Sequence, residues 1–225
     1  MIKVHYLNNS RAQRILFMLE EMGTPYETEV FMREHNLAPP SLKKIHPLGK
    51  APVITDGDLV IAESGAIIEY LAEKYGKETM IPAGGFDSQA VLDYKYWLHY
   101  AEGSLMPPLV MQLIFNRIKT SKMPFFVKPI AKGIVQKVEE SYLGPNISTH
   151  MGFVDDYLSK NEWFAGDSIS AADVQMLFPL EASVNQKGFA AQYPNIAAYV
   201  KRLQARPAYQ RALDAGEPYA FAGKS

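Results

Sequence analysis

The sequence predicts an α/β domain over residues 1–80, followed by an all-helical, bundle-like domain over residues 88–225. In the first part, short strand-like runs alternate with helical periods, whereas the apolar periods of the second part are helical. Residues 76–87 contain three glycines and a proline without any apolar period. Such a segment is typical of the link between two domains, so we place the boundary there.

The first strand and the first helix are expected between residues 2 and 25. Apolar and polar residues alternate from Ile2 to Tyr6, as in a strand with one buried face. Residues 10–13 (Ser-Arg-Ala-Gln) have the form of a capping box, and apolar residues then recur at helical spacing. Gly23-Thr24-Pro25 predicts the end of this helix, because glycine suits a C-cap and proline cannot continue the helix.

The rest of the first domain is expected to hold three more strands and a second long helix. Residues 26–31 predict the second strand, and a loop with a short helix follows. Asp56-Gly57 predicts the tight turn of a hairpin, since both residues tolerate a positive φ. Pro52 stands at the entry of the first hairpin strand, where a cis peptide bond can occur. The last helix is expected to begin beside Glu63-Ser64 and to end near Tyr75.

Prolines divide the long helices of the second domain. A helix over residues 88–115 must be kinked or broken at Pro107-Pro108, because each proline lacks an N–H and clashes with the preceding turn. Gly144-Pro145 offers a second interruption, in the helical stretch from about residue 125 to residue 158.

The clearest helix start in the chain is Ser170. Asp173 stands at the third helical position, which completes a capping box, and apolar residues occupy both staple positions. We therefore interpret Asp173 as structural rather than catalytic. The final helix is expected to open at Pro194 and to stop before Pro207.

Charge and composition exclude several classes of function. The net charge is −1 and the 23 basic residues are scattered, so there is no electrostatic basis for binding nucleic acid or an anionic membrane. The absence of cysteine excludes disulfides, thiolate metal sites and a cysteine nucleophile. No apolar run approaches the ~18 residues of a membrane span, and strand-like alternation begins at Ile2, so we expect a cytoplasmic protein without anchor or signal peptide. No metal site is expected, because the histidines that could contribute to one lie far apart in the chain: His5, His46, His99 and His150.

The helix that begins beside Ser64 is the strongest candidate for a ligand site. Glu63 and Ser64 place an acid and a hydroxyl at its mouth, where the first-turn N–H groups and the helix dipole favour negative charge. The competing interpretation is an exposed acid ahead of an ordinary cap. The preceding stretch, residues 49–54 with Pro52 at its centre, favours the ligand site. Together these features predict a site for a small anionic ligand.

Two further groups have competing interpretations. Ser10 is either an ordinary helix cap or a hydroxyl donor, and the two roles are compatible. Aromatic and methionine side chains at helical spacing are more typical of a core than of a ligand pocket. An adaptable apolar pocket for a second substrate is the alternative. The residues concerned are Trp97, Tyr100, Met106, Met111 and Phe115.

Four stretches of the chain resemble the glutathione transferase family. Residues 47–53 and 63–71 are similar to its glutathione-binding domain, and residues 164–173 and 194–207 to its helical domain. Their order and spacing cover nearly the full chain. The resemblance implies a thioredoxin-like domain over the first ~80 residues, followed by a helical substrate-binding domain.

The resemblance also implies which residues hold glutathione. Ala51 would pair its backbone with the cysteinyl backbone of the ligand, next to a cis Pro52. Ser64 would bind the γ-glutamyl carboxylate and Glu63 its ammonium group, while Lys50 would reach the glycyl carboxylate. Glutathione is thus expected as the co-substrate, with no metal.

The residue that acts on the glutathione thiol is less directly indicated. Many family members use a tyrosine or a cysteine, but here Tyr6 lies in the predicted strand and cysteine is absent, which points to the serine-type branch. Ser10 is the first choice for the thiol donor, and Asn9 is the second, since the register is uncertain by one residue. A further ligand contact is expected between His35 and Ala38.

The implied activity is transfer of the glutathione thiolate to small apolar electrophiles by a homodimer. A surplus of large side chains in residues 88–115 also favours a dimer. The alternatives are glutathione-dependent reduction of peroxides or disulfides, and a binding module of the same fold without turnover.

Overall fold

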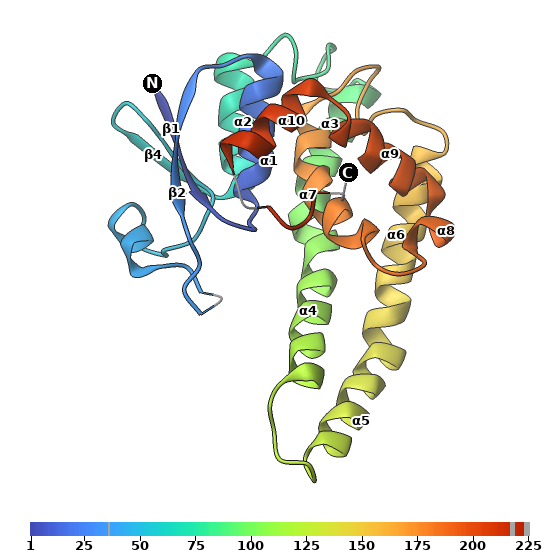
Figure 1. The fold of residues 1–225 in the computed structure, drawn as a ribbon. Coiled ribbons are helices and arrows are strands. Elements are labelled where there is room, and N and C mark those ends of the chain that lie inside the picture. Colours follow the sequence, from blue (N-terminus) through green and yellow to red (C-terminus); the bar gives the residue numbers. More distant parts are fainter. Residues whose placement is uncertain (36, 217–218, 223–225) are drawn as a thin grey trace.

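A computed structural model describes residues 1–35, 37–216 and 219–222 of the chain. A four-stranded sheet with two adjacent helices is followed by a larger helical part, from which a long pair of helices projects (Figure 1). This arrangement confirms the predicted class, a thioredoxin-like α/β part followed by an all-helical part. Within the described residues, no helix is both long enough and apolar enough to cross a membrane. The division at residues 80 and 88 stays a prediction.

The sheet has the order β2-β1-β3-β4. β1 (Ile2–Leu7) runs parallel to β2 (Tyr26–Phe31) and antiparallel to β3 (Val53–Asp56). β3 and β4 (Leu59–Ala62) form the predicted hairpin, with Gly57 at φ 60° in the turn. A short 3-10 helix, η1 (Pro40–Lys44), lies in the connection before β3.

β1 is buried on both faces, which differs from the predicted half-buried strand. Among its residues only Lys3 is partly exposed. His5, expected on the open face, is 3% exposed because side chains of the neighbouring β2 cover it. Its Nδ1 lies 3.0 Å from Glu29 Oε2, and its ring lies against that of Phe31. Burial lowers the pKa of His5, and Glu29 opposes this shift.

The helix α1 (Ala12–Met22) lies at the centre of the molecule, in contact with β1, α2 (Ser64–Tyr75) and two helices of the helical part. Gly23, at φ 63°, forms the expected C-cap. The capping box predicted at its start is wrong. Gln13 does not reach back to Ser10, because its Oε1 accepts from the Tyr6 hydroxyl at 3.0 Å.

At each of the two predicted proline interruptions, a π-helical turn precedes the prolines and replaces the regular α-helix, but the helix is not broken. The turn η2 (Ala101–Leu105) joins α3 (Gln89–Tyr100) to α4 (Met106–Thr120), which carries Pro107-Pro108 in its first turn. Likewise, η3 (Glu139–Leu143) joins α5 (Lys128–Val138) to α6 (Gly144–Leu158). A π turn changes the hydrogen-bonding register just before residues that cannot donate, so the helix continues without a break. The first helical stretch therefore extends past residue 115.

The capping box at α7 (Ala171–Val184) is confirmed. Asp173 Oδ2 accepts from the backbone N–H of Ser170 at 2.8 Å, and its Oδ1 accepts from Phe164 N–H and the Tyr199 hydroxyl. The one-turn helix α8 (Phe189–Gln192) follows.

The helix that opens at Pro194 is not the final one. α9 (Pro194–Gln204) ends before Pro207 as predicted, but Pro207 occupies the first turn of another helix, α10 (Pro207–Ala215). A proline at a helix N-terminus loses no hydrogen bond, so the same residue that ends one helix starts the next. α10 packs on α1.

Candidate functional site

A pocket of about 560 Å³ lies between the sheet part and the helical part. Its first wall is made by the loop before β3, the end of β4 and the start of α2. The opposite wall comes from the end of α3, η2 and α7, and Arg11 joins the two. The lining residues are Arg11, His46, Leu48, Lys50, Ala51, Pro52, Ala62, Glu63, Ser64, Gly65, Ala66, Leu98, His99, Glu102, Gly103 and Gln175. Five of the seven residues proposed from the sequence are thus brought together: Lys50, Ala51, Pro52, Glu63 and Ser64.

The loop before β3 presents open backbone groups to the pocket. The Ala51–Pro52 peptide bond is cis, as expected. Neither the N–H nor the C=O of Ala51 hydrogen-bonds to another described residue. Lys50, beside it, is exposed and forms no ion pair within the same residues. This loop can therefore pair with an extended ligand backbone and meet a negative charge.

The start of α2 carries the acid and the hydroxyl. Glu63 adopts φ 72°, a conformation that costs a non-glycine residue about 1–3 kcal/mol and that clusters at ligand sites. Its carboxylate is exposed, with no hydrogen bond or ion pair to the described part of the chain. Ser64 is 4% exposed, and its hydroxyl is likewise without a partner there. The first N–H groups of α2 have no intrahelical acceptor, so they add donors at the same place.

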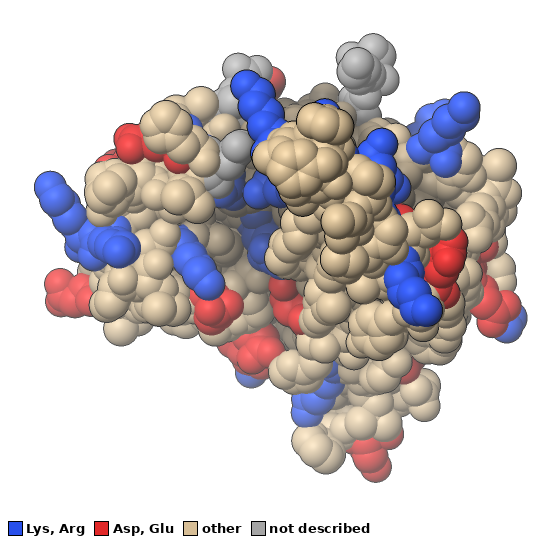
Figure 2. Space-filling model, turned by 90° about the horizontal axis from the view of Figure 1, so that it is seen from below, with Lys and Arg blue, Asp and Glu red and all other residues tan. Residues whose placement is uncertain are grey.

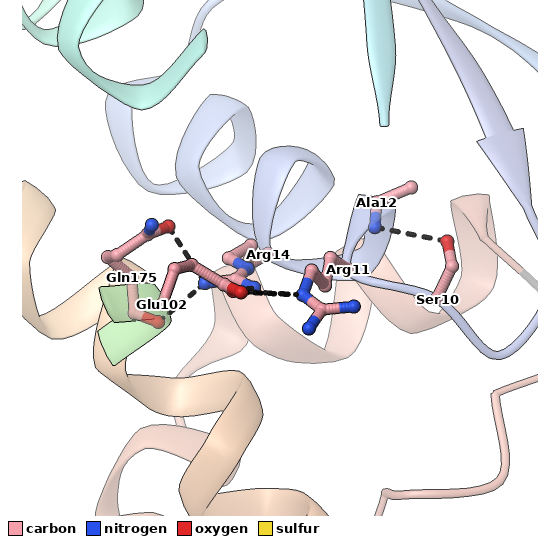
Figure 3. Close-up of polar contacts among 6 residues, drawn as sticks. All are labelled: Ser10, Arg11, Ala12, Arg14, Glu102 and Gln175. Carbon is pink, nitrogen blue, oxygen red and sulfur yellow. Dashed lines mark hydrogen bonds and ion pairs between the residues drawn. The ribbon is translucent and has the colours of Figure 1, made fainter. Parts of the chain in front are cut away.

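A charged network forms the helical wall (Figure 3). Glu102, in η2, accepts from Arg11 Nε at 2.9 and 3.0 Å and also from Arg14. Arg14 donates its other terminal nitrogen to the backbone and side-chain oxygens of Gln175, at 2.7 and 2.8 Å. Both guanidinium groups lie over the ring of Phe178. The network ties α1 to η2 and α7 across the two parts of the molecule.

The charges of this network are set by burial and by one another. Burial lowers the pKa of Arg14, and Glu102 opposes that shift. Burial acts to raise the pKa of Glu102, but Arg14 and Arg11 together hold it below its usual value. The two arginines and one carboxylate therefore leave a net positive charge on this side of the pocket.

Ser10 is close to the pocket but does not line it. The residue is 6% exposed, and its hydroxyl donates to Leu7 O at 2.6 Å and accepts from Ala12 N–H at 3.2 Å. The single hydroxyl proton is thus already used (Figure 3 shows the Ala12 contact). Tyr6 is fully buried, and burial raises the pKa of its phenol.

Asn9 has a different environment. It adopts φ 53°, and its Oδ1 accepts from the backbone N–H of Ala220 at 2.7 Å. The amide nitrogen Nδ2 makes no hydrogen bond to a described residue. Asn9 is not among the residues that line the pocket either, and its role stays a proposal.

The remaining expectations concern the segment from His35 to Ala38 and the aromatic and methionine side chains of the helical part. Asn36 lies outside the described residues, and the rest of the segment from His35 to Ala38 does not line the pocket. Trp97, Tyr100 and Met106 are buried in the core, which confirms their structural interpretation. Met111 and Phe115, which were proposed with them, do not line the pocket either, so its helical wall is polar apart from Leu98 and Gly103.

Sequence reasoning missed four residues that line the pocket: His46, His99, Glu102 and Gln175. One local signal existed, since His46 directly precedes the stretch at residues 47–53. The others share no sequence pattern with the first wall. Within the described residues, no group of three or more potential ligands could hold a metal ion.

Comparison with known proteins agrees with this geometry. Residues 10–74 match the family model "Glutathione S-transferase, N-terminal domain", and residues 118–213 match "Glutathione S-transferase, C-terminal domain". The chain is 35% identical over 216 residues to Glutathione S-transferase 3 of Schizosaccharomyces pombe, covering 95% of this chain and 87% of the relative. It is also 35% identical to Glutathione S-transferase 1 of Saccharomyces cerevisiae, with 92% of each chain covered.

Solved structures give the same result. A glutathione S-transferase from Actinobacillus pleuropneumoniae superposes with a TM-score of 0.79 at 30% identity, over 100% of this chain and 97% of the other. A glutathione S-transferase from Methylobacillus flagellatus with GSH bound has a TM-score of 0.71 at 21% identity, over 94% and 98% of the two chains, and shares the fold. With both domain matches and these relatives, the chain belongs to the glutathione S-transferase family.

Proposed function

We propose that this protein binds glutathione in the pocket between its two parts and transfers the glutathione thiolate to a second substrate. The observation that carries the proposal is the set of polar groups on the first wall. Lys50, Glu63 and the Ser64 hydroxyl all line the pocket without a protein partner among the described residues. The Lys50 and Glu63 charges are exposed and free to pair with a ligand, whereas the buried Ser64 hydroxyl lacks a partner within the described part of the chain, which a ligand could supply, and the family membership indicates the ligand.

The charges match glutathione group by group. The tripeptide has two carboxylates and one ammonium group. The start of α2 with Ser64 suits the γ-glutamyl carboxylate, Glu63 suits the ammonium, and Lys50 suits the glycyl carboxylate. Ala51, whose backbone groups have no partner among the described residues, lies between Lys50 and Glu63 along the chain. The Methylobacillus flagellatus structure, which shares the fold, holds GSH, and this supports glutathione as the ligand.

In the proposed reaction, the sulfur of the thiolate forms a bond to an electrophilic carbon, and the leaving group departs with the bonding electrons. The thiolate needs a hydrogen-bond donor to lower its pKa. Both candidates, Ser10 and Asn9, lie at the start of α1, whose N-terminal dipole favours the anion. The Ser10 hydroxyl already donates its proton to Leu7 O, whereas Asn9 Nδ2 has no acceptor among the described residues. This difference favours Asn9 as the donor to the thiolate.

Disulfide reduction is the second candidate function. It is favoured by the polar helical wall, with Arg11, His99, Glu102 and Gln175, which suits a polar partner better than an apolar one. Here the thiolate would attack one sulfur of a mixed disulfide and release the other as a thiol. A substrate panel of aryl halides, hydroperoxides and mixed disulfides, assayed with glutathione, separates the two reactions.

The glutathione site itself is tested by Ser64→Ala. Loss of a hydrogen bond to a charged group costs roughly 1.5–3 kcal/mol, so the glutathione dissociation constant should rise about tenfold or more in calorimetry. Ser88→Ala is the matched control, because Ser88 also starts a helix but does not line the pocket. A change of less than twofold for Ser64→Ala would remove the assignment.

We also propose a homodimer in the cytoplasm. Support for the dimer comes from α3 and α4, which leave large apolar side chains exposed to about half of their area: Leu92, Tyr96, Leu113 and Ile114. Seen from below, acidic and basic side chains are interspersed over the surface, and the projecting helices carry broad uncharged areas (Figure 2). Exposed apolar surface of this extent is typical of an interface between protein chains.

A further inference from the structure

The described C-terminal residues return to the start of α1. Residues 219–222 lie beside α1 and α7 (Figure 1). Three consecutive residues, Tyr219, Ala220 and Phe221, make the contacts described below. We call residues 219–221 the C-terminal strap.

Both ends of the strap are anchored on or next to α7. The Tyr219 hydroxyl donates to Glu181 Oε2 at 2.8 Å. The Phe221 ring packs edge-on against Phe178, with 5.6 Å between ring centroids, and the Phe221 carbonyl accepts from Asn185 Nδ2 at 3.2 Å. Glu181 is itself buried and held by Tyr209 and Gln204. The strap is thus attached to buried residues of α7.

The middle of the strap contacts Asn9. The backbone N–H of Ala220 donates to Asn9 Oδ1 at 2.7 Å. Because an N–H can pair only with an acceptor, this contact decides which end of the Asn9 amide is the oxygen. The opposite end, Nδ2, then points away from the strap with two N–H donors that no described residue accepts. Asn9 O accepts from Arg33 Nη2 at 3.3 Å, which holds the backbone as well.

Ser10, the neighbouring candidate, has no free hydrogen-bond donor in its side chain. Its hydroxyl proton is used by Leu7 O, so Ser10 could serve a ligand only by breaking a buried hydrogen bond. Arg11 follows in the chain and lines the pocket. The free donors of Asn9 therefore lie at the same helix start that the thiolate is proposed to approach.

We propose that the C-terminal strap positions Asn9 so that its Nδ2 donates to the bound glutathione thiolate. Tyr219, Ala220 and Phe221 are positioning residues in this scheme, and Asn9 is the residue that touches the sulfur. The scheme rests on the proposed function, since it needs glutathione in the pocket. In this scheme, residues 219–221 contribute to activation of the thiol.

The test removes one backbone hydrogen-bond donor from the strap. Ala220→Pro deletes the N–H that holds Asn9 Oδ1, in the full-length chain. The kinetic pKa of the bound thiol is read from the pH dependence of kcat/KM with 1-chloro-2,4-dinitrobenzene, and from the ultraviolet absorbance of the thiolate. We expect the thiol pKa to rise by about one unit, since a hydrogen bond to a charged group is worth that much or more. The glutathione dissociation constant should stay within about twofold.

A double-mutant cycle tests whether the strap changes the thiol pKa through Asn9. Asn9→Ala alone should raise the thiol pKa at least as much as Ala220→Pro. Adding Ala220→Pro to Asn9→Ala should then cause no further rise, because the strap acts through Asn9. Additive shifts would overturn the proposal, as would an unchanged thiol pKa in Ala220→Pro. A purely structural strap would lower the free energy of unfolding and leave the thiol pKa as it was.

A second variant covers the case in which Ala220→Pro does not fold. Tyr219→Phe keeps the backbone and removes only the hydroxyl that anchors the strap to Glu181. It should shift the thiol pKa upward by a smaller amount, and no shift would overturn the proposal. Tyr75→Phe is the matched control, because it removes a hydroxyl that donates to Asp56 at the surface.

Failure of the proposed function has its own signature. If the unmodified protein shows no heat of glutathione binding, both the proposed function and the strap scheme fail. If it binds glutathione and the strap variants leave the thiol pKa unchanged, only the strap scheme fails.

Discussion

Arg14 and Glu102 stand 88 positions apart in the chain and form an ion pair between α1 and η2. The Arg14 side chain is 1% exposed, whereas that of Glu102 is 32% exposed and faces the pocket. One carboxylate thus neutralises a buried cation while it forms part of the helical wall. The stability of the contact between the two parts and the shape of the pocket depend on the same pair.

Glu102→Ala should lower the free energy of unfolding by about 3 kcal/mol, because it leaves the buried Arg14 without its counter-charge. Urea denaturation measures the loss. Asp156→Ala is the control, since it breaks the exposed ion pair with Lys160 and should cost about 0.5 kcal/mol or less. Equal losses in the two variants would contradict the role given to this pair.

Asn9→Ala should slow conjugation of a model aryl halide and raise the kinetic pKa of the bound thiol. A free thiol has a pKa of ~8.5, and lowering it by about two units needs about 2.7 kcal/mol of preferential thiolate stabilisation. Asn9 Nδ2, the dipole of α1 and the charge of Arg11 together can supply that amount. The pH dependence of kcat/KM gives the pKa.

Ser10→Ala is the companion variant. It should reduce the free energy of unfolding by about 1 kcal/mol through loss of the Leu7 contact, with little change in the thiol pKa. If Ser10→Ala raises the pKa and Asn9→Ala does not, the first choice made from the sequence is right and Ser10 is the donor. If neither variant matters, the thiolate does not lie at this loop.

Glu181 should make stability depend on pH. Burial raises the pKa of its carboxyl to about 7, although hydrogen bonds from Gln204, Tyr209 and Tyr219 and the charge of Arg14 act in the opposite direction. Its unfolded pKa is the lower of the two, so the folded state binds more protons between about pH 4.5 and pH 7. The contribution of Glu181 is therefore present in full below the unfolded pKa and is lost as pH rises through 7.

Comparison with Glu181→Gln isolates this effect. From pH 4.5 to pH 7, the free energy of unfolding of the unmodified protein should fall relative to that of the variant by roughly 3 kcal/mol. Urea denaturation at a series of pH values measures the difference. A difference that is constant with pH would show that Glu181 titrates alike in the folded and unfolded chains.

Light scattering at micromolar concentration should give a mass of about twice 25.2 kDa. Leu92→Asp places a charge in the apolar face of α3 and should shift the mass toward the monomer. Ile134→Asp is the control, because Ile134 is at least as exposed but lies on α5. A mass near 25.2 kDa for the unmodified protein would refute the dimer.

Local patterns in the sequence were sufficient for much of the fold. The cis bond at Pro52 was implied by the family resemblance, whereas the cap at Ser170 with Asp173 and the turn at Gly57 each depend on residues within a few positions of one another. The same holds for the first wall of the pocket. Glu63 and Ser64 are adjacent, and a helix start has the same donors in any fold.

The errors came from contacts between distant segments. His5 was expected on the open face because the side chains that cover it come from other strands, such as Glu29, 24 residues away. The donor role of Ser10 stays a prediction, because the pairing of its hydroxyl with the nearby Leu7 O depends on the local backbone conformation, which the order of residues does not reveal. The polar wall combines Arg11, Glu102 and Gln175. These residues come together only because α1, η2 and α7 pack against one another.

The two π-helical turns fix the rotational phase of the projecting helices. A π turn holds one residue more than an α turn, so η2 decides the direction in which every side chain of α4 points. Deletion of Gly103 would return the segment to an α-helical count, turn α4 by about 100° about its axis and draw it back by about 1.5 Å. Leu113 and Ile114 would then leave their present face, and α4 would meet η3 with a different set of side chains. In this fold, a single-residue insertion or deletion inside a continuous helix can therefore change the direction of a whole surface, together with the buried side chains at the start of α4, such as Met106.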